Sequence, residues 1–227
     1  MIKKVLSIDL DFILKPIIQL YNDMVKKEPY QLLWSKIEEE RCIQDFLKYD
    51  EDKLKFIYDI LNTINLKKIY YGNSHESILL AIQEEIGKND KIELYNIDHH
   101  HDINYNIDQE NLALIYDVVD CGSWVTLLHK NKLIQKYIWI KNSNSKKYRG
   151  KKESSPYLIE YNFEDYSQIT FSDFDMIYIT SSQQWFPPKF LYIIEDLKKF
   201  LNQKFEIIDY GWQEFNENGQ SRKLILK

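Results

Sequence analysis

Residues 91–104, KIELYNIDHHHDIN, decide how the rest of the chain is interpreted. The first half, residues 92–97, is a short apolar run typical of a buried central strand. Alternate side chains of an extended or gently curling chain point the same way, so Asp98, His100 and Asp102 should converge on one point. Two carboxylates and one imidazole that converge are typical ligands of a divalent cation such as Mn, Fe, Zn or Co. This stretch therefore predicts a metal site at the carboxyl end of a central strand.

A simpler interpretation of the same residues is a polar loop that happens to be rich in histidine. Three adjacent histidines between two aspartates at a strand end argue against it. Under the metal interpretation, His99 and His101 face away from the site, and we expect them to have packing or supporting roles.

Two other segments have the same design. Residues 3–9 form an apolar strand that ends in Asp9-Leu10-Asp11, and residues 67–71 form a second strand that is followed by His75. Acids next to a core are costly unless a cation or hydrogen-bond donors compensate them. An aspartate that caps the following helix is the alternative, and it explains one acid of the pair more easily than both.

Strands and helices alternate along the chain. Further strands are expected within residues 132–141, 157–163, 174–180 and 204–210, helices within 50–64, 78–86, 125–130 and 187–201, and a strand or turn at 115–120. This alternation predicts an α/β protein with a three-layer α/β/α architecture and a mainly parallel sheet.

In such a fold the ligand site lies beyond the carboxyl ends of the strands. Six candidate metal ligands should meet there: Asp9, Asp11, His75, Asp98, His100 and Asp102. Four carboxylates and two imidazoles suit two cations better than one. Two ions about 3.5–4 Å apart can turn a shared water into hydroxide near neutral pH, which indicates a hydrolytic reaction.

Length and composition limit the remaining choices. The 227 residues fit one domain, 1–227, in which two amphipathic helices at 35–64 could form a helical insertion. The hydrophobic content of 44% indicates a globular chain. A net charge of −5 with both signs mixed argues against a nucleic-acid partner.

Cysteine usage and hydropathy bear on the compartment. The two cysteines, Cys42 and Cys121, suggest a reducing environment without a disulfide framework. No apolar run approaches the ~20 residues that a membrane span requires. We therefore expect a cytoplasmic protein with no membrane partner, which acts on a peptide or small-molecule substrate. Homo-oligomer formation is left open.

The three acid and histidine motifs resemble those of the arginase/deacetylase superfamily, its ureohydrolase side in particular. Residues 98–104, DHHHDIN, are similar to the DAHxDIN run of that family; residues 7–11, SIDLD, resemble its SxDxD run; and residues 72–77, GNSHES, resemble its GGDHS run. The motif order departs from arginase, where the SxDxD strand follows the DAHxD strand. A circularly permuted order would reproduce the same site.

Two further segments, CGSW at 121–124 and TSSQQWFP at 180–187, resemble the peptide arginases. Those enzymes convert arginine side chains within a precursor peptide to ornithine and release urea. The resemblance implies an arginase-like fold and two divalent metal ions, with Mn²⁺ as the expected metal. One ion would be held by His75, Asp98, Asp102 and Asp9, and the other by His100, Asp98, Asp9 and Asp11, so that Asp98 and Asp9 bridge the pair.

The resemblance also implies roles around the substrate. Asn104 matches a substrate-contacting Asn, and Asp98, Asp9, Asn104 and Asp120 are the expected catalytic residues. Where arginases carry a Glu that orients the guanidinium, this chain has Ser181, Ser182, Gln183 and Gln184, with no acid. We expect substrate contacts from Asn104, Asp117, Ser123, Gln183 and Gln184, with Asp117 or Asp120 in place of that Glu. His129 is the remaining candidate for the general acid/base, and an exposed helix histidine is the simpler interpretation.

Two other functions fit part of the pattern. The DHH phosphoesterases also combine an N-terminal DxD strand with a later Asp-His-His, but they typically carry a glycine-rich run where this chain has FILK at 12–15. A binding protein that keeps a metal site without turnover is the other alternative, and the missing Glu favours it.

Overall fold

The computed structural model describes residues 1–15, 48–143, 145, 148, 157–182 and 186–210. In these residues one sheet contains seven parallel strands in the order β5-β4-β3-β1-β6-β2-β7. The strands are β1 (Ile2–Asp9), β2 (Lys68–Gly72), β3 (Lys91–Asp98), β4 (Ile134–Lys141), β5 (Leu158–Asn162), β6 (Met176–Thr180) and β7 (Glu206–Asp209). The expected parallel sheet is therefore confirmed.

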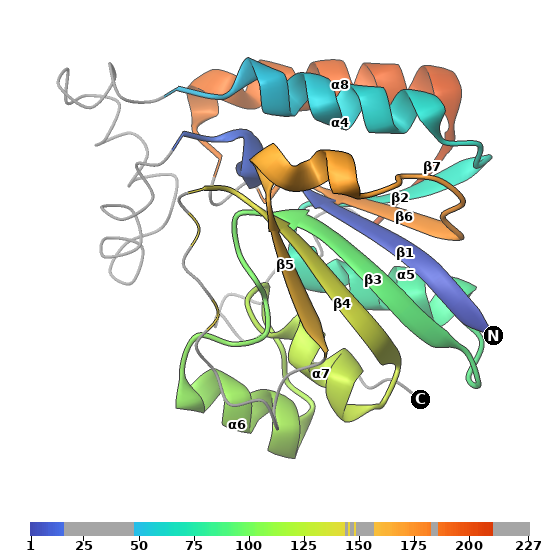
Figure 1. The fold of residues 1–227 in the computed structure, drawn as a ribbon, viewed down its shortest axis with the longest axis vertical. Coiled ribbons are helices and arrows are strands. Elements are labelled where there is room, and N and C mark those ends of the chain that lie inside the picture. Colours follow the sequence, from blue (N-terminus) through green and yellow to red (C-terminus); the bar gives the residue numbers. More distant parts are fainter. Residues whose placement is uncertain (16–47, 144, 146–147, 149–156, 183–185, 211–227) are drawn as a thin grey trace, which may run out of the picture.

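Helices cover both faces of the sheet, which confirms the three-layer α/β/α fold (Figure 1). One layer contains α4 (Glu51–Thr63) and α8 (Leu191–Lys204). The other contains α5 (Ile78–Glu85), α6 (Ile107–Tyr116) and α7 (Trp124–Lys130). Short 3-10 helices follow several strands: η1 (Leu10–Ile13), η2 (His75–Ser77), η4 (Phe163–Gln168) and η6 (Pro188–Phe190). No helix in these described residues is both long and apolar enough to cross a membrane.

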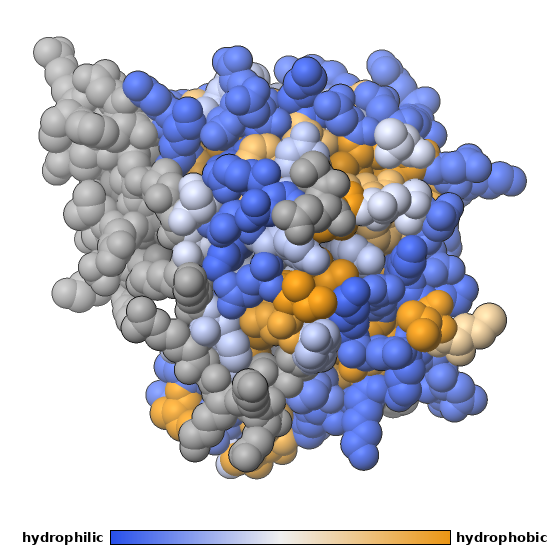
Figure 2. Space-filling view, viewed as in Figure 1, coloured by the Kyte–Doolittle hydropathy of each residue, from blue (hydrophilic) through white to orange (hydrophobic). Residues whose placement is uncertain are grey.

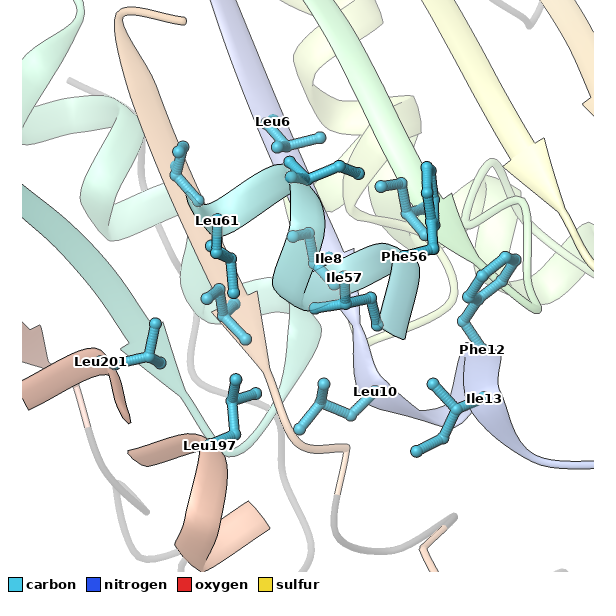
Figure 3. Packing of buried hydrophobic residues seen from close by; sticks show 14 of the residues in the cluster. Leu6, Ile8, Leu10, Phe12, Ile13, Phe56, Ile57, Leu61, Leu197 and Leu201 are labelled. Atoms are coloured by element: carbon cyan, nitrogen blue, oxygen red, sulfur yellow. The ribbon is translucent and has the colours of Figure 1, made fainter. Parts of the chain in front are cut away.

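The central strand β1 is buried on both faces. Leu6 and Ile8 pack against Ile57 and Leu61 of α4 and against α8 (Figure 3). Full burial of each such side chain contributes about 1.5–3 kcal/mol to stability. The outer sides of α4 and α8 are hydrophilic (Figure 2), as the amphipathic sequence pattern requires. This packing fixes the end of β1, where Asp9 and Asp11 begin the candidate site.

The connections out of β1 and β3 run in opposite directions. From β1 the chain passes through α4 on one face to β2, whereas from β3 it passes through α6 and α7 on the other face to β4. Because these two strands are neighbours, their carboxyl ends form the topological switch point, the place where parallel sheets commonly bind ligands.

The structure differs from the expected strand or turn at residues 115–120, and it describes only part of the expected helical insertion. Residues 115–120 are not a strand, because α6 continues to Tyr116 and this helix was not predicted. Of the segment 35–64 expected as a helical insertion, residues 35–47 lie outside the described residues. The remaining part, α4, packs against the sheet itself.

Candidate metal centre

Strand register brings two acids together at the carboxyl edge. Ile8 of β1 pairs with Ile97 of β3, so the next residues, Asp9 and Asp98, lie side by side at the ends of the two strands. The exposed fraction of Asp9 is 3% and that of Asp98 is 0%. Two carboxylates buried side by side need a compensating positive charge or protons.

The first ligand cluster surrounds His75, which begins η2 after β2. The His75 Nδ1 atom lies 3.1 Å from Oδ2 of Asp98, 3.4 Å from Oδ2 of Asp9 and 2.9 Å from Oδ2 of Asp102. Even so, Nδ1 makes no well-directed hydrogen bond within the described part of the chain. Three carboxylate oxygens thus converge on one nitrogen without forming well-directed hydrogen bonds to it. Ligands around a cation are arranged in this way.

The back of the His75 ring is held in place. Its Nε2 lies 2.6 Å from Ser7 Oγ, and its ring centroid lies 4.8 Å from that of Trp124 and 6.3 Å from that of Tyr178. If Nε2 carries the proton and donates a hydrogen bond to Ser7 Oγ, the lone pair of Nδ1 faces the acids. This is the usual support of a metal-ligating histidine.

The second cluster contains Asp11, Asp98 and His100. Nδ1 of His100 lies 3.0 Å from Asp11 Oδ2 and 3.8 Å from Asp98 Oδ1. The Asp11 side chain is fully buried, and neither of its oxygens has a well-directed hydrogen bond in the described residues. The His100 side chain is 20% exposed, so the centre opens to solvent on this side.

Asp98 belongs to both clusters and turns a different oxygen to each. Oδ2 faces His75 and Oδ1 faces His100. The carboxylate is oriented by Asn96 Nδ2, 3.2 Å from Oδ2, and by the backbone N–H of His100, 2.7 Å from Oδ1. A carboxylate placed in this way can bridge two cations, and the Asp/His donor set suits Mn²⁺, Fe²⁺ or Zn²⁺.

Asp102 reaches the first cluster because the backbone turns after Asp98. The chain does not stay extended through residues 98–102, because β3 ends at Asp98 and Asp102 has a left-handed backbone with φ 51°, yet both carboxylates reach His75. Such a conformation costs about 1 kcal/mol or more and is retained when the surroundings enforce it. Here Trp124 Nε1 donates to Asp102 Oδ2 at 2.7 Å and fixes the carboxylate.

Electrostatics within the clusters favour proton retention when no cation is present. Burial, followed by the charges of Asp102 and Asp9, raises the pKa of Asp98 to about 7. Burial also raises the pKa of Asp9 and of Asp11. Burial lowers the pKa of His100, but the neighbouring acids, Asp11 first and then Asp98 and Asp102, together raise it to about 10. A bound cation would take over the charge that these protons carry.

The other two histidines of the run face different surroundings. His101 stacks on Tyr105 with ring centroids 4.3 Å apart, and its Nδ1 accepts a hydrogen bond from Ile103 N at 3.2 Å. Burial, and then the charge of His100, lowers the pKa of His101 to about 3, so this ring stays neutral. His99 packs edge-on against His100, with centroids 4.9 Å apart.

The expected substrate residues are placed less uniformly. Asp120 accepts from Gly122 N at 3.0 Å, Ser123 Oγ at 2.8 Å and Gln109 Nε2 at 2.9 Å, so Asp120 and Ser123 together shape the start of α7. Asp117 ends α6 and pairs with Lys130 at 2.7 Å. The acids proposed to replace the arginase Glu thus make their contacts at helix ends.

Four further residues were expected near the substrate. Asn104 has a φ of 140°, and its buried Nδ2 lacks a hydrogen-bond partner in the described residues. His129 lies in the last turn of α7, the end remote from Trp124, and burial lowers its pKa. Gln183 and Gln184 lie outside the described residues.

Several supporting residues were missed. Ser7 and Asn96 pair in register across β1 and β3, each two positions before a ligand aspartate, and polar residues inside apolar strands could have revealed them. Ser182 Oγ donates to Asp9 Oδ2. Glu76, next to His75 in η2, bonds Ser74 Oγ and has a pKa raised by burial.

Comparison of the chain with protein-family models, curated proteins and solved structures gives no significant match. The fold and the buried Asp/His clusters define the chain as an α/β protein with a site that could hold a metal ion.

Proposed function

We propose that the protein is a dinuclear metal-dependent hydrolase that cleaves a C–N bond of a guanidinium group. The substrate is an arginine side chain within a peptide or another large molecule, the products are ornithine and urea, and the metal is Mn²⁺.

The position of Asp98 is the observation that carries this proposal. It offers one oxygen to the His75 cluster and the other to the His100 cluster. One ligand atom from each residue lies within 4.8 Å of the others in the group Asp9, His75 and Asp98 and in the group Asp11, Asp98 and His100. Buried acids with unsatisfied oxygens support cation binding further, since an unpaired buried carboxylate is costly.

The division between buried and exposed ligands supports a reaction at one side of the centre. Asp9, His75 and Asp98 are buried and can hold the ions, whereas His100 borders the solvent. A substrate would therefore approach past His100. Asn104, two residues after Asp102, is the group that the resemblance assigns to substrate contact.

When bound, the two ions activate water near neutral pH and stabilise the charge that develops on the substrate. In the net reaction the water oxygen adds to the guanidinium carbon, and the bond from that carbon to the side-chain nitrogen breaks. The arginine cation and water give urea and the ornithine ammonium, so charge is conserved.

The test is urea release from an arginine-containing peptide by the Mn²⁺-loaded protein, with free arginine and a chromogenic phosphodiester as parallel substrates. We expect urea from the peptide and none from an Asp98→Ala variant, while the exposed control Asp196→Ala keeps full activity. Cleavage of the phosphodiester without urea release would favour the DHH phosphoesterase function. Two bound ions without turnover of either substrate would favour a binding protein.

A further inference from the structure

The turn that carries Asp11 lies beyond the sheet. Strand pairing of β1 ends where Asp9 faces Thr180, and the chain then turns through η1. Within this turn the N–H of Asp11 donates to Asp9 Oδ1 at 3.0 Å, and the N–H of Leu14 donates to the Asp11 carbonyl at 2.9 Å. These local bonds give the turn its shape but do not fix its position relative to His100.

Asn142 ties this turn to a distant strand. It follows β4, which is separated from β1 by β3, and its exposed fraction is 1%. Its Nδ2 donates to the Phe12 carbonyl at 2.9 Å and to the Leu14 carbonyl at 3.3 Å. Phe12 lies within the turn and Leu14 directly follows it, so one amide links this turn to the end of β4.

Lys53 in turn orients Asn142. Its Nζ donates to Asn142 Oδ1, and because an ammonium only donates, the amide must turn its oxygen to Lys53 and its nitrogen to the turn. Lys53 lies on the apolar face of α4 with an exposed fraction of 5%, and its Nζ is 5.3 Å from the centroid of the Phe12 ring. Its acidic neighbour, Asp50, is 3.9 Å away and also donates its N–H to the Ile13 carbonyl at 2.8 Å.

A buried lysine is a costly way to stabilise a core. An apolar side chain of similar size would serve stability as well or better, because the ammonium must be desolvated. Burial lowers the pKa of Lys53, which reflects this cost. The ammonium adds a directed hydrogen bond to the Asn142 amide, and this amide holds the turn that carries Asp11.

We propose that Lys53 and Asn142 are positioning residues that hold the Asp11 turn in place, so that Asp11 and His100 can bind the second cation. This inference rests on the two-ion part of the proposed function.

The test is Mn²⁺ titration of the full chain by calorimetry, with electron paramagnetic resonance to detect coupling between two bound Mn²⁺ ions. Asn142→Asp keeps the acceptor for Lys53 but loses the donor to the turn. We expect the second ion to bind about 10–100-fold more weakly in this variant, while the first binds as in the wild type. The coupled signal should give way to that of an isolated ion. Lys53→Met should weaken the second ion in the same way, whereas Lys53→Arg, which keeps a donor to Asn142, should retain much of the affinity for the second ion.

Lys141→Met is the matched control. Lys141 is equally buried, at 5% exposure, and lies at the same edge, but it pairs with Glu160 and not with Asn142. It should lower thermal stability and leave both ions bound. Two outcomes would overturn this inference and leave the proposed function standing. In one, Asn142→Asp and Lys53→Met bind two ions with unchanged affinity. In the other, Lys141→Met loses the second ion to the same extent as these variants. A wild-type chain that binds a single ion would overturn it together with the two-ion proposal.

Discussion

Asp98 and His75 meet at 3.1 Å, although β3 and β2 lie on opposite sides of β1 in the sheet. Their contact spans the carboxyl edge across the central strand, and Asp9 at the end of β1 completes the group. The ligands therefore come from segments that only the folded sheet brings together.

Neutralising Asp98 should empty both clusters. Asn has the shape of Asp but no charge, so Asp98→Asn leaves His75 and His100 without their shared carboxylate. We expect the Mn²⁺ content after equilibrium dialysis to fall from two ions per chain to less than one. Asp196→Asn, an exposed change on α8, should keep two ions. Full Mn²⁺ occupancy in Asp98→Asn would show that the ligand assignment is wrong.

Ser7 should affect metal affinity without touching the metal. Ser7→Ala removes the group 2.6 Å from His75 Nε2 that fixes the ring. Loss of such support weakens metal binding about 10–100-fold, and calorimetric titration with Mn²⁺ can measure this. Ser181→Ala is the control, since Ser181 is also fully buried but faces Asn73 at 3.4 Å. Equal affinities in Ser7→Ala and the wild type would contradict the support role.

The metal-free protein should lose stability as pH rises from 7 to 9. The folded-state pKa of His100 is about 10, above its ordinary value of 6.5, so the protonated ring stabilises the fold. That contribution is complete below pH 6.5 and is lost as pH rises through 10. The expected decrease in the free energy of unfolding between pH 7 and 9 is about 2 kcal/mol.

Urea unfolding of chelator-treated protein at several pH values tests this expectation. His100→Gln should reduce the pH dependence without abolishing it, because it removes one titrating ring while His75, whose pKa the surrounding acids also raise, remains. Added Mn²⁺ should reverse the trend, since metal binding displaces protons and strengthens as pH rises. A metal-free wild type that gains stability between pH 7 and 9 would contradict the proposed charge balance of the centre.

Free arginine should be a poor substrate compared with peptide-bound arginine. The stretch that matches the arginase Glu contains no acid, and the acids suggested as replacements, Asp117 and Asp120, are engaged at helix ends. Contacts along a larger substrate would then have to supply the orientation. We expect kcat/KM for urea release to be at least about tenfold lower for free arginine. Comparable values for both substrates would refute this prediction.

The sequence was sufficient for the sheet and for the two acid pairs. Apolar runs that end in Asp9 or Asp98 mark buried strands, and parallel packing then places their ends at one edge. It was insufficient for α6, because Ala113 is its one buried residue in the described structure while Ile115 and Tyr116 are exposed. A helix with that pattern lacks the apolar periodicity on which prediction depends.

The finer geometry of the site depends on contacts between distant segments. The carboxylate of Asp102 is held by Trp124, and the orientation of Asn142 is set by Lys53. Local sequence around either residue contains no signal for its partner. Lys53 does occupy an inward position on α4 beside Phe56 and Ile57, and a lysine there is a sign of a buried polar contact.

The central place of β1 has a consequence for biosynthesis. This strand is translated before both of its neighbours, β3 and β6, which are complete only after Asp98 and Thr180 have been made. A ribosome-bound chain that stops short of β6 therefore holds an apolar strand with one flank open, which other chains could pair with. Nascent chains halted before Thr180 should need protection by chaperones that chains carrying β6 no longer require.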